Sequence, residues 1–457
     1  MRILLLSLIL AFTVTACKDE KNKQMEDKAK TFQMPEWAKN AVIYEVNIRQ
    51  YTPEGTLNAF SDHIPRLKAM GVDILWLMPV FPISETKRKG SLGSYYAVSD
   101  FRQVNPEFGT IEDLKNLIDK IHAYKMKVIL DWVPNHTGWD HTWIKTHPEY
   151  YTKGADGQIT DPLDPNTGQP YGWSDVADLN YDNADMRKNM IDDLLYWVKD
   201  HKVDGFRMDI AFGVPLDFWK TCADSLMNAN DQLFLLAEAE TPEQLNEETF
   251  HACYGWSFFH TMNAIAKGEK NVSHIRSWLQ SERPKFVKGS IMHFITNHDE
   301  NSWNGTEFER LGNGYKAFAI LTMTFDGIPL IYSGQEEPLT ARLKFFEKDT
   351  IHFNKFSNMD FYSTLTALKH QEEAIWNEPY GAPLQWLGQS EYIVAFKREK
   401  NNSKVVVMAN LSDQKRKIIL DEDVRGMLDI YRRIDVNYNK GSEVEMLPWE
   451  SWVMIKK

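Results

Sequence analysis

Apolar runs of strand length recur along this chain and alternate with amphipathic stretches of helical length. The apolar runs occupy residues 41–48, 72–80, 127–133, 203–211, 233–240, 254–260, 291–297 and 328–333. Helical patterns occupy residues 57–70, 111–124 and 186–200, and the second of these opens with the capping-box pair Thr110 and Asp113. This alternation predicts a parallel sheet, and eight repeats favour a closed (β/α)8 barrel.

Two regions interrupt this alternation. Residues 137–181, after the third run, are rich in Gly, Pro, Asp and Trp and show little periodicity. An irregular insertion of this length is usually a functional loop or a small subdomain, and it follows a strand end on the side where barrel active sites lie. After residue 375, short β-branched runs separated by turn residues predict an antiparallel domain. We therefore assign the barrel to residues 36–375 and a C-terminal β-sandwich to residues 376–457.

The N-terminal segment has the pattern of a targeting signal. Arg2 precedes an apolar run over residues 3–14, and small residues lead to Cys17. This pattern predicts a lipoprotein signal peptide over residues 1–16, with Cys17 as the lipidated residue, although Cys17 could also lie near a plain cleavage site. Residues 17–35 are rich in charged and amide side chains and are expected to form a flexible tether.

The three residues after Cys17, K-D-E, resemble the surface-export signal of Bacteroidetes lipoproteins. We therefore expect a protein anchored by lipid to the outer membrane of the cell, with no other membrane contact, because no later run offers 18 apolar residues. We also expect a monomer.

Composition narrows the function. The net charge of −12 argues against nucleic-acid binding, which needs a basic surface. Fifteen tryptophans are a weak indication of carbohydrate binding, since aromatic faces also suit sugar rings. The two remaining cysteines, Cys222 and Cys253, lack the spacing of a metal site, and the sequence cannot show whether they meet in a disulfide.

The run at residues 203–211, V-D-G-F-R-M-D-I-A, carries two charged residues on one face of the expected strand. Arg207 and Asp209 are two residues apart, and side chains in a strand alternate between faces. A guanidinium beside a carboxylate is expected to lower the carboxylate pKa and keep it ionised, as a nucleophile requires. The alternative is a structural ion pair at a strand end.

Other expected strands also end in polar residues, where barrel catalysis occurs. These residues are Asp131, Asn135 and His136 after the third run, Glu238 and Glu240 after the fifth, and Asn297, His298, Asp299 and Glu300 after the seventh. So many carboxylates on one rim are costly unless the function requires them.

Four of these stretches, D-W-V-P-N-H, G-F-R-M-D, L-L-A-E and T-N-H-D, resemble the four signature regions of the α-amylase family, glycoside hydrolase family 13, and they come in the family's order. A fifth stretch, V-A-D-L-N at residues 176–180, is similar to the region that closes the family's domain B. The resemblance extends over residues ~36 to 457. It implies a TIM barrel with a short domain B after strand 3 and a C-terminal β domain.

The resemblance also implies roles for individual residues. Asp209 matches the nucleophile, Glu238 the general acid/base, and Asp299 the third carboxylate, which binds and distorts the sugar. The positions that match substrate-binding residues are Tyr96, His136, Arg207 and His298. No cofactor is needed for this chemistry.

A structural calcium ion is a further implication of the resemblance. Asn135 and Asp178 match calcium ligands of some family members, although many relatives lack the metal.

The chemistry of retaining glycoside hydrolysis is consistent with these roles. It needs two carboxyl groups about 5–5.5 Å apart, one ionised and one protonated. The apolar residues before Glu238 favour its protonated form. Glu240 lies on the same strand face as Glu238, so alternation cannot choose between them, and only the family motif selects Glu238.

We expect cleavage of internal α-1,4-glucosidic bonds in starch- or glycogen-like glucans or maltooligosaccharides. After Asp209 the sequence I-A-F-G-V-P departs from typical α-amylases and looks more like neopullulanases and cyclomaltodextrinases. A related enzyme of that kind, an α-glucosidase or a transglucosylase is therefore the alternative. A non-catalytic glucan-binding surface lipoprotein is a third reading, but such a protein would be expected to lose a carboxylate.

Several aromatic residues are candidate sugar platforms, although each is as well explained by core packing. These residues are Tyr95, Trp139, Trp173, Trp256 and Trp303.

Overall fold

The computed structural model describes residues 32–164 and 167–457. The predicted signal peptide at residues 1–16, the lipidation site Cys17 and most of the predicted tether at residues 17–35 lie outside the described residues. Within the described part of the chain, no helix is long and apolar enough to cross a membrane.

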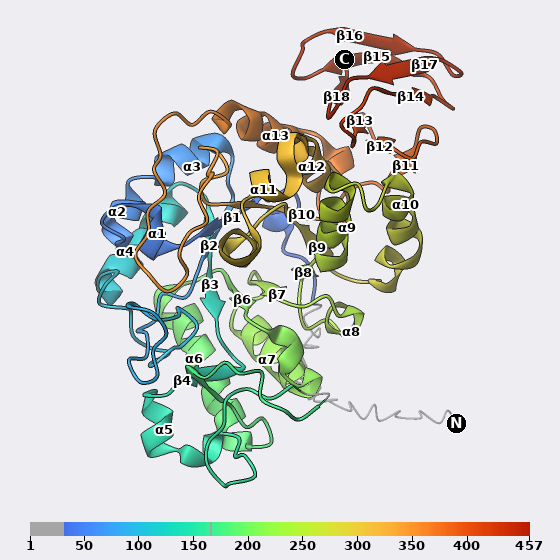
Figure 1. Cartoon of the computed structure of the whole chain (residues 1–457). Helices are drawn as coiled ribbons and strands as arrows, with labels where there is room; N and C mark the ends of the chain where they lie inside the picture. Colours follow the sequence, from blue (N-terminus) through green and yellow to red (C-terminus); the bar gives the residue numbers. More distant parts are fainter. Residues whose placement is uncertain (1–31, 165–166) are drawn as a thin grey trace, which may run out of the picture. The chain divides into compact units, whose positions relative to one another are not determined.

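Eight parallel strands close into a barrel, in the order β1-β10-β9-β8-β7-β6-β3-β2, as Figure 1 shows. The strands are β1 (Ile43–Val46), β2 (Ile74–Leu77), β3 (Lys127–Trp132), β6 (Gly205–Met208), β7 (Phe234–Ala237), β8 (Ala252–Tyr254), β9 (Ser290–His293) and β10 (Ile328–Tyr332). Nearly every strand residue is buried, because side chains point either into the barrel or against the outer helices, so these strands appear in sequence as continuous apolar runs. The predicted TIM barrel is confirmed.

The strands are connected by helices and short turns. The α-helices are α1 (Ile48–Tyr51), α2 (Leu57–Ser61), α3 (Ile64–Met70), α4 (Ile111–Ala123), α5 (Thr142–Thr146), α6 (Ala184–His201), α7 (Leu216–Ala229), α8 (Pro242–Asn246), α9 (Trp256–Ala266), α10 (Val272–Ser281), α11 (Glu307–Leu311), α12 (Tyr315–Thr324) and α13 (Met359–Gln371). The short turns are the 3-10 helices η1 (Glu36–Ala38), η2 (Pro148–Tyr150), η3 (Ala211–Gly213), η4 (Arg283–Lys285), η6 (Gly312–Gly314) and η7 (Glu373–Ile375), and the π-helix η5 (Glu300–Asn304). The predicted capping box of Thr110 and Asp113 is present at the start of α4.

Two predicted elements were wrong. The run at residues 254–260 is not a strand, because β8 ends at Tyr254 and α9 begins at Trp256, with its buried side chains at helical spacing. The helix predicted at residues 57–70 is two helices, α2 and α3. Pro65, near the start of α3, lacks the N–H that a continuous helix would need there.

The insertion after β3 holds a two-stranded antiparallel pair, β4 (His136–Gly138) with β5 (Val176–Asp178). The C-terminal strands are β11 (Gln385–Trp386), β12 (Ile393–Lys400), β13 (Ser403–Asn410), β14 (Arg416–Ile419), β15 (Val424–Asp429), β16 (Asp435–Tyr438), β17 (Glu443–Met446) and β18 (Ser451–Lys456). They form a six-stranded and a two-stranded antiparallel sheet that share one buried apolar core, which confirms the predicted β-sandwich. Cys222 on α7 and Cys253 on β8 are buried free thiols.

Candidate active site

The nucleophile candidate follows the end of β6. This strand ends at Met208, and Ile210 adopts a left-handed conformation with φ 44° and ψ 44°. A β-branched residue is rare in this region, and such strain is typical of functional sites. The turn directs the Ile210 N–H to Glu238 Oε2 at 2.7 Å. The strained turn therefore links the residue after Asp209 to the carboxylate that follows β7.

Arg207 lies at the centre of three carboxylates from three neighbouring strands. Its Nη1 donates to Asp131 Oδ1 at 2.8 Å and to Asp209 Oδ1 at 2.9 Å. Its Nη2 lies 2.8 Å from Glu238 Oε2. The Arg207 side chain is fully buried, so little solvent screens these charges.

One guanidinium shared by three carboxylates changes the expected electrostatics. Burial and the charge of Glu238 raise the pKa of Asp209 well above its usual value, and Arg207 only partly opposes this rise. Burial likewise raises the pKa of Asp131 to about 6. The expectation that Arg207 holds the pKa of Asp209 low was therefore wrong. The set of carboxylates retains a proton more readily than isolated carboxylates do.

The structure separates Glu238 from its rival Glu240. Glu238 lies in the Arg207 cluster, whereas Glu240 accepts hydrogen bonds from Ser257 N at 2.8 Å and Ser257 Oγ at 2.5 Å. Ser257 is in the first turn of α9, where backbone N–H groups lack partners within the helix. Glu240 therefore caps a helix, and no ion pair within the described residues joins it to Arg207.

Asp299 is the most exposed of the three predicted catalytic carboxylates, with 36% of its side chain accessible. Its Oδ2 lies 3.4 Å from His298 Nε2. The same nitrogen lies 2.8 Å from Tyr96 Oη, and the hydroxyl of Tyr96 donates to Asp131 Oδ2 at 3.1 Å. Tyr96 and His298 therefore connect Asp299 to the Arg207 cluster.

Glu45, on β1, is a site residue that the sequence reasoning missed. Its Oε1 accepts from His298 Nδ1 at 2.5 Å, and both side chains are buried. Tyr254 Oη, which accepts from Arg207 Nε at 3.1 Å, and Trp76 Nε1, which donates to Asp131 Oδ2 at 3.1 Å, were missed as well. The available signal was a charged or polar group inside an otherwise apolar strand run.

This arrangement predicts an unusual titration of His298. The charges of Asp299 and Glu45 raise the pKa of His298 to about 9, so its ring is protonated at neutral pH and loses its charge as the pH rises through about 9. In Glu45→Gln one of these charges is gone, and we expect the pKa of His298 to fall by about one unit or more. Histidine-ring NMR, with His298→Asn to assign the signal, measures this shift. A His298 pKa that Glu45→Gln leaves unchanged would contradict it.

The buried His136 provides the internal comparison for that titration. Burial lowers the pKa of His136 to about 3, so its ring stays neutral over the same pH range. His136 makes a hydrogen bond with the Tyr96 backbone and an edge contact with Trp173, with 6.1 Å between the ring centroids. His136 therefore lies beside both Tyr96 and one of the candidate sugar platforms.

The two predicted calcium ligands are neighbours in the structure. Leu179 N donates to the backbone oxygen of Asn135 at 3.2 Å, one residue beyond Asp178. Burial raises the pKa of Asp178 to about 7, and within residues 32–164 and 167–457 no cationic side chain forms an ion pair with its carboxylate. Calcium takes six to eight oxygen ligands, and one amide and one carboxylate supply only part of such a set. Across residues 32–164 and 167–457, no three His, Cys, Asp or Glu side chains form a metal-binding group. The calcium site stays a prediction.

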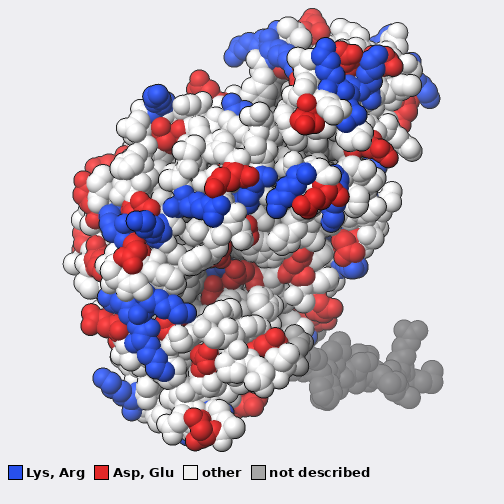
Figure 2. All heavy atoms as spheres, in the orientation of Figure 1, with Lys and Arg blue, Asp and Glu red and all other residues white. Residues whose placement is uncertain are grey.

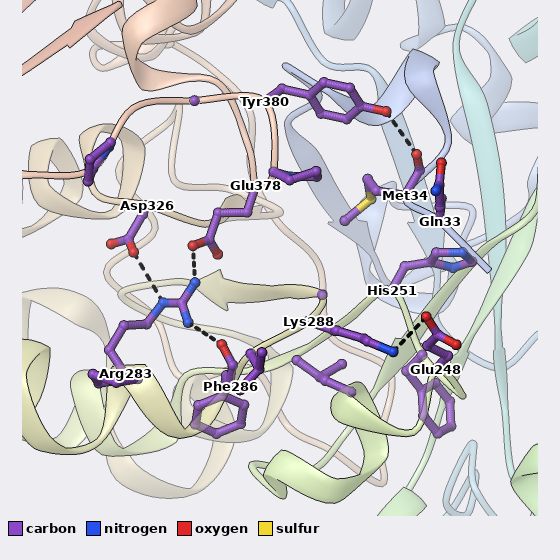
Figure 3. A pocket seen from close by; sticks show the side chains of 18 of the residues that line it. Gln33, Met34, Glu248, His251, Arg283, Phe286, Lys288, Asp326, Glu378 and Tyr380 are labelled. Atoms are coloured by element: carbon purple, nitrogen blue, oxygen red, sulfur yellow. Dashed lines mark hydrogen bonds and ion pairs between the residues drawn. The ribbon is translucent and has the colours of Figure 1, made fainter. Parts of the chain in front are cut away.

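A cavity of about 750 Å³, drawn in Figure 3, is lined by none of the carboxylates around Arg207. His251 and Asp326, which line it, come just before β8 and β10, so the cavity is at the amino-terminal ends of the strands. Arg283 Nε pairs with Asp326 Oδ2 at 3.1 Å, and Arg283 also pairs with Glu378. These three charged groups of the cavity wall therefore pair with one another. Residues at the amino-terminal end of such a barrel usually contribute to stability. Figure 2 shows acidic side chains gathered in a hollow on another part of the surface.

Carboxylates that follow the strands of a (β/α)8 barrel place this protein among the barrel enzymes. A model of the α-amylase catalytic domain matches residues 18–418. The chain therefore belongs to the α-amylase family.

Three individual relatives share only 23–28% of their aligned residues with this chain. The chain is 25% identical to α-amylase MalA of Haloarcula japonica over 84% of its own length, and it spans 57% of that relative. It is 23% identical to a cyclomaltodextrinase of Thermoanaerobacter pseudethanolicus, over 93% of this chain and 79% of the relative. The crystal structure of an α-amylase from Lactobacillus plantarum superposes with a TM-score of 0.80 and 28% identity, covering 92% of this chain and 100% of that one.

Proposed function

We propose that this protein is a retaining glycoside hydrolase that cleaves internal α-1,4-glucosidic bonds in starch- or glycogen-like glucans or maltooligosaccharides. One observation carries the proposal: a single guanidinium holds one oxygen of Asp209 and one of Glu238. Within the described residues, Asp209 Oδ2 has no hydrogen-bond partner and no hydrogen bond involves Glu238 Oε1. Each carboxyl group therefore has one oxygen held by Arg207 and one oxygen without a hydrogen-bond partner among the described residues.

In the first step, Asp209 Oδ2 attacks the anomeric carbon while the C–O bond to the leaving sugar breaks. Glu238 gives its proton to the leaving oxygen, and a glycosyl ester forms on Asp209. The reacting state has Asp209 ionised and Glu238 protonated. The crowding of carboxylates around Arg207 supports one retained proton in the set, because the set then carries one negative charge fewer. The match of Glu238 to the family's general acid/base supports placing that proton on Glu238.

In the second step, water attacks the same carbon from the face that the first sugar left. Glu238, now ionised, takes a proton from the water, and Asp209 leaves as a free carboxylate, so the configuration is retained. Asp299 and His298 would bind sugar hydroxyls, and Tyr96 would support the ring of the sugar at the cleavage point. The protonated His298 supplies a charged donor, which makes stronger hydrogen bonds than a neutral one.

The second candidate is a cyclomaltodextrinase- or neopullulanase-like specificity. The residues after Asp209 support it, because the sequence I-A-F-G-V-P departs there from typical α-amylases. Phe212, in this stretch, lies on η3 and is 51% exposed. The cyclomaltodextrinase relative, matched over 93% of this chain, supports it equally.

Product analysis on amylose, pullulan, β-cyclodextrin and maltoheptaose separates the two candidates. We expect endo-type release of maltooligosaccharides from amylose, with the α-configuration at the new reducing end by NMR. Rates on cyclodextrin and pullulan above the rate on amylose would favour the second candidate. Binding of starch without release of reducing sugar would exclude both.

We also propose that the protein is a lipoprotein of the outer membrane, of the kind found in Bacteroidetes, attached through Cys17, and that it is a monomer. The residues before and after Cys17 support the anchor. Cys17→Ser should abolish incorporation of labelled fatty acid and release the protein from the membrane fraction.

A further inference from the structure

The structure separates the five candidate aromatic platforms. Tyr95 is buried, Trp256 packs against the barrel core, and Trp139 lies beneath the ammonium of a lysine at 3.2 Å. Trp173 stacks on a neighbouring tyrosine, with 4.5 Å between ring centroids. Trp303 differs from all of these because 52% of its surface is exposed. Exposure of one large apolar side chain is common and by itself indicates nothing.

Trp303 belongs to a row of aromatic rings that leads to Tyr96. Its ring centroid lies 5.3 Å from that of Phe345, at an interplanar angle of 37°. Phe345 in turn is stacked with Tyr96, 6.2 Å away at 15°. Exposure falls along the row from Trp303 through the half-buried Phe345 to Tyr96, which is 8% exposed. The row therefore runs from solvent to the ring that contacts His298 and Asp131.

The protein holds this row in place. Trp303 is on the π-helix η5, which begins directly after Asp299, and such helices are frequent at functional sites. From the same helix, Asn301 Oδ1 accepts from Leu343 N at 2.9 Å and Asn301 Nδ2 donates to the backbone oxygen of Ala341 at 3.2 Å. These bonds fix η5 to the loop that carries Phe345. Rigid platforms lose little entropy when a ligand binds.

We propose that Trp303 and Phe345 extend the Tyr96 platform into a binding subsite for further glucose units of an α-glucan, on one side of the cleavage point. A pyranose ring has a face of C–H groups that packs on an aromatic face, and the ring-to-ring steps of 5.3 and 6.2 Å are comparable with the size of one sugar. The subsite rests on the proposed function, and it makes the affinity for a glucan depend on the number of its glucose units. Glucans that reach Trp303 bind more tightly than those that end at Tyr96.

The test measures binding in Asp209→Asn, which keeps the ligand intact. Titration calorimetry compares maltoheptaose with maltose in this background, with and without Trp303→Ala. We expect Trp303→Ala to weaken maltoheptaose binding by about tenfold and to change maltose binding by less than about twofold. Trp303→Phe keeps an aromatic face and should retain most of the affinity. Tyr124→Ala removes another exposed ring, 40% exposed at the end of α4, and serves as the matched surface control.

The outcomes separate the subsite from the catalytic proposal. Equal maltoheptaose affinity with and without Trp303 overturns the subsite, whether or not the wild-type protein is active. A wild-type protein that binds maltoheptaose through Trp303 but releases no reducing sugar supports the subsite and overturns the hydrolase. Loss of affinity for both ligands in Trp303→Ala, with the thermal midpoint unchanged, places Trp303 at the cleavage position and also overturns the extended subsite.

Discussion

Replacement of Asp209 by asparagine is expected to lower kcat/KM on amylose by on the order of 10⁴-fold or more, because no glycosyl ester can form without the carboxylate. Asparagine has nearly the same shape and keeps an oxygen that can accept the hydrogen bond from Arg207 Nη1, now 2.9 Å from Asp209 Oδ1. The loss should therefore appear in kcat, with little change in the affinity for maltooligosaccharides. Steady-state kinetics and calorimetry on the same preparation measure both quantities.

The stability of this variant provides its control. The pKa of Asp209 is raised in the folded protein, so at neutral pH its ionisation costs folding free energy, and a neutral asparagine avoids that cost. This loss of folding free energy is absent at low pH and grows as the pH rises above the usual pKa of an aspartate. We expect the thermal midpoint at pH 7 to be unchanged or higher in Asp209→Asn. An inactive variant with a much lower midpoint would instead indicate misfolding.

Most of the barrel could be predicted because each strand is buried on both faces and appears as one apolar run. The ends of the runs were less predictable. The run at residues 203–211 continues beyond β6, since Ile210 is apolar but occupies a left-handed turn. The run at residues 254–260 is aromatic and suits a strand by propensity, yet it begins a helix. That helix receives its cap from Glu240, 17 residues earlier, a contact that no local pattern reveals.

The candidate site was predictable where its residues share a strand and less so where they meet across strands. Alternation placed Arg207 and Asp209 on one face, and the structure shows them in contact. Arg207 also contacts two carboxylates from other strands. Its contact with Asp131 depends on the register of β6 with β3, where the two residues are opposite each other, and its contact with Glu238 depends on the turn after β6. Glu45 reaches His298 from the far end of the sequence, so only the closure of the barrel brings them together.

Replacement of Glu238 by glutamine is expected to lower kcat/KM on amylose by about 10²–10⁴-fold, because glutamine cannot protonate the leaving oxygen. The loss should depend on the leaving group. An α-glucosyl fluoride needs no proton to leave, so its first step should be nearly normal in Glu238→Gln. The second step still needs a base, and a glycosyl ester should accumulate. Mass spectrometry of the digested protein should find the sugar on the peptide that contains Asp209.

Glu240→Gln is the matched control, since it makes the same chemical change two residues away. Glu240 bonds to Ser257 at the start of α9 and has no contact with Arg207 in the described structure. The amide keeps only one acceptor oxygen for the two donors of Ser257, so part of the cap is lost, which costs about 0.5–2 kcal/mol of stability. We therefore expect Glu240→Gln to lower the thermal midpoint and leave kcat within about threefold of wild type. Activity retained by Glu238→Gln and lost in Glu240→Gln would reverse the assignment of the acid.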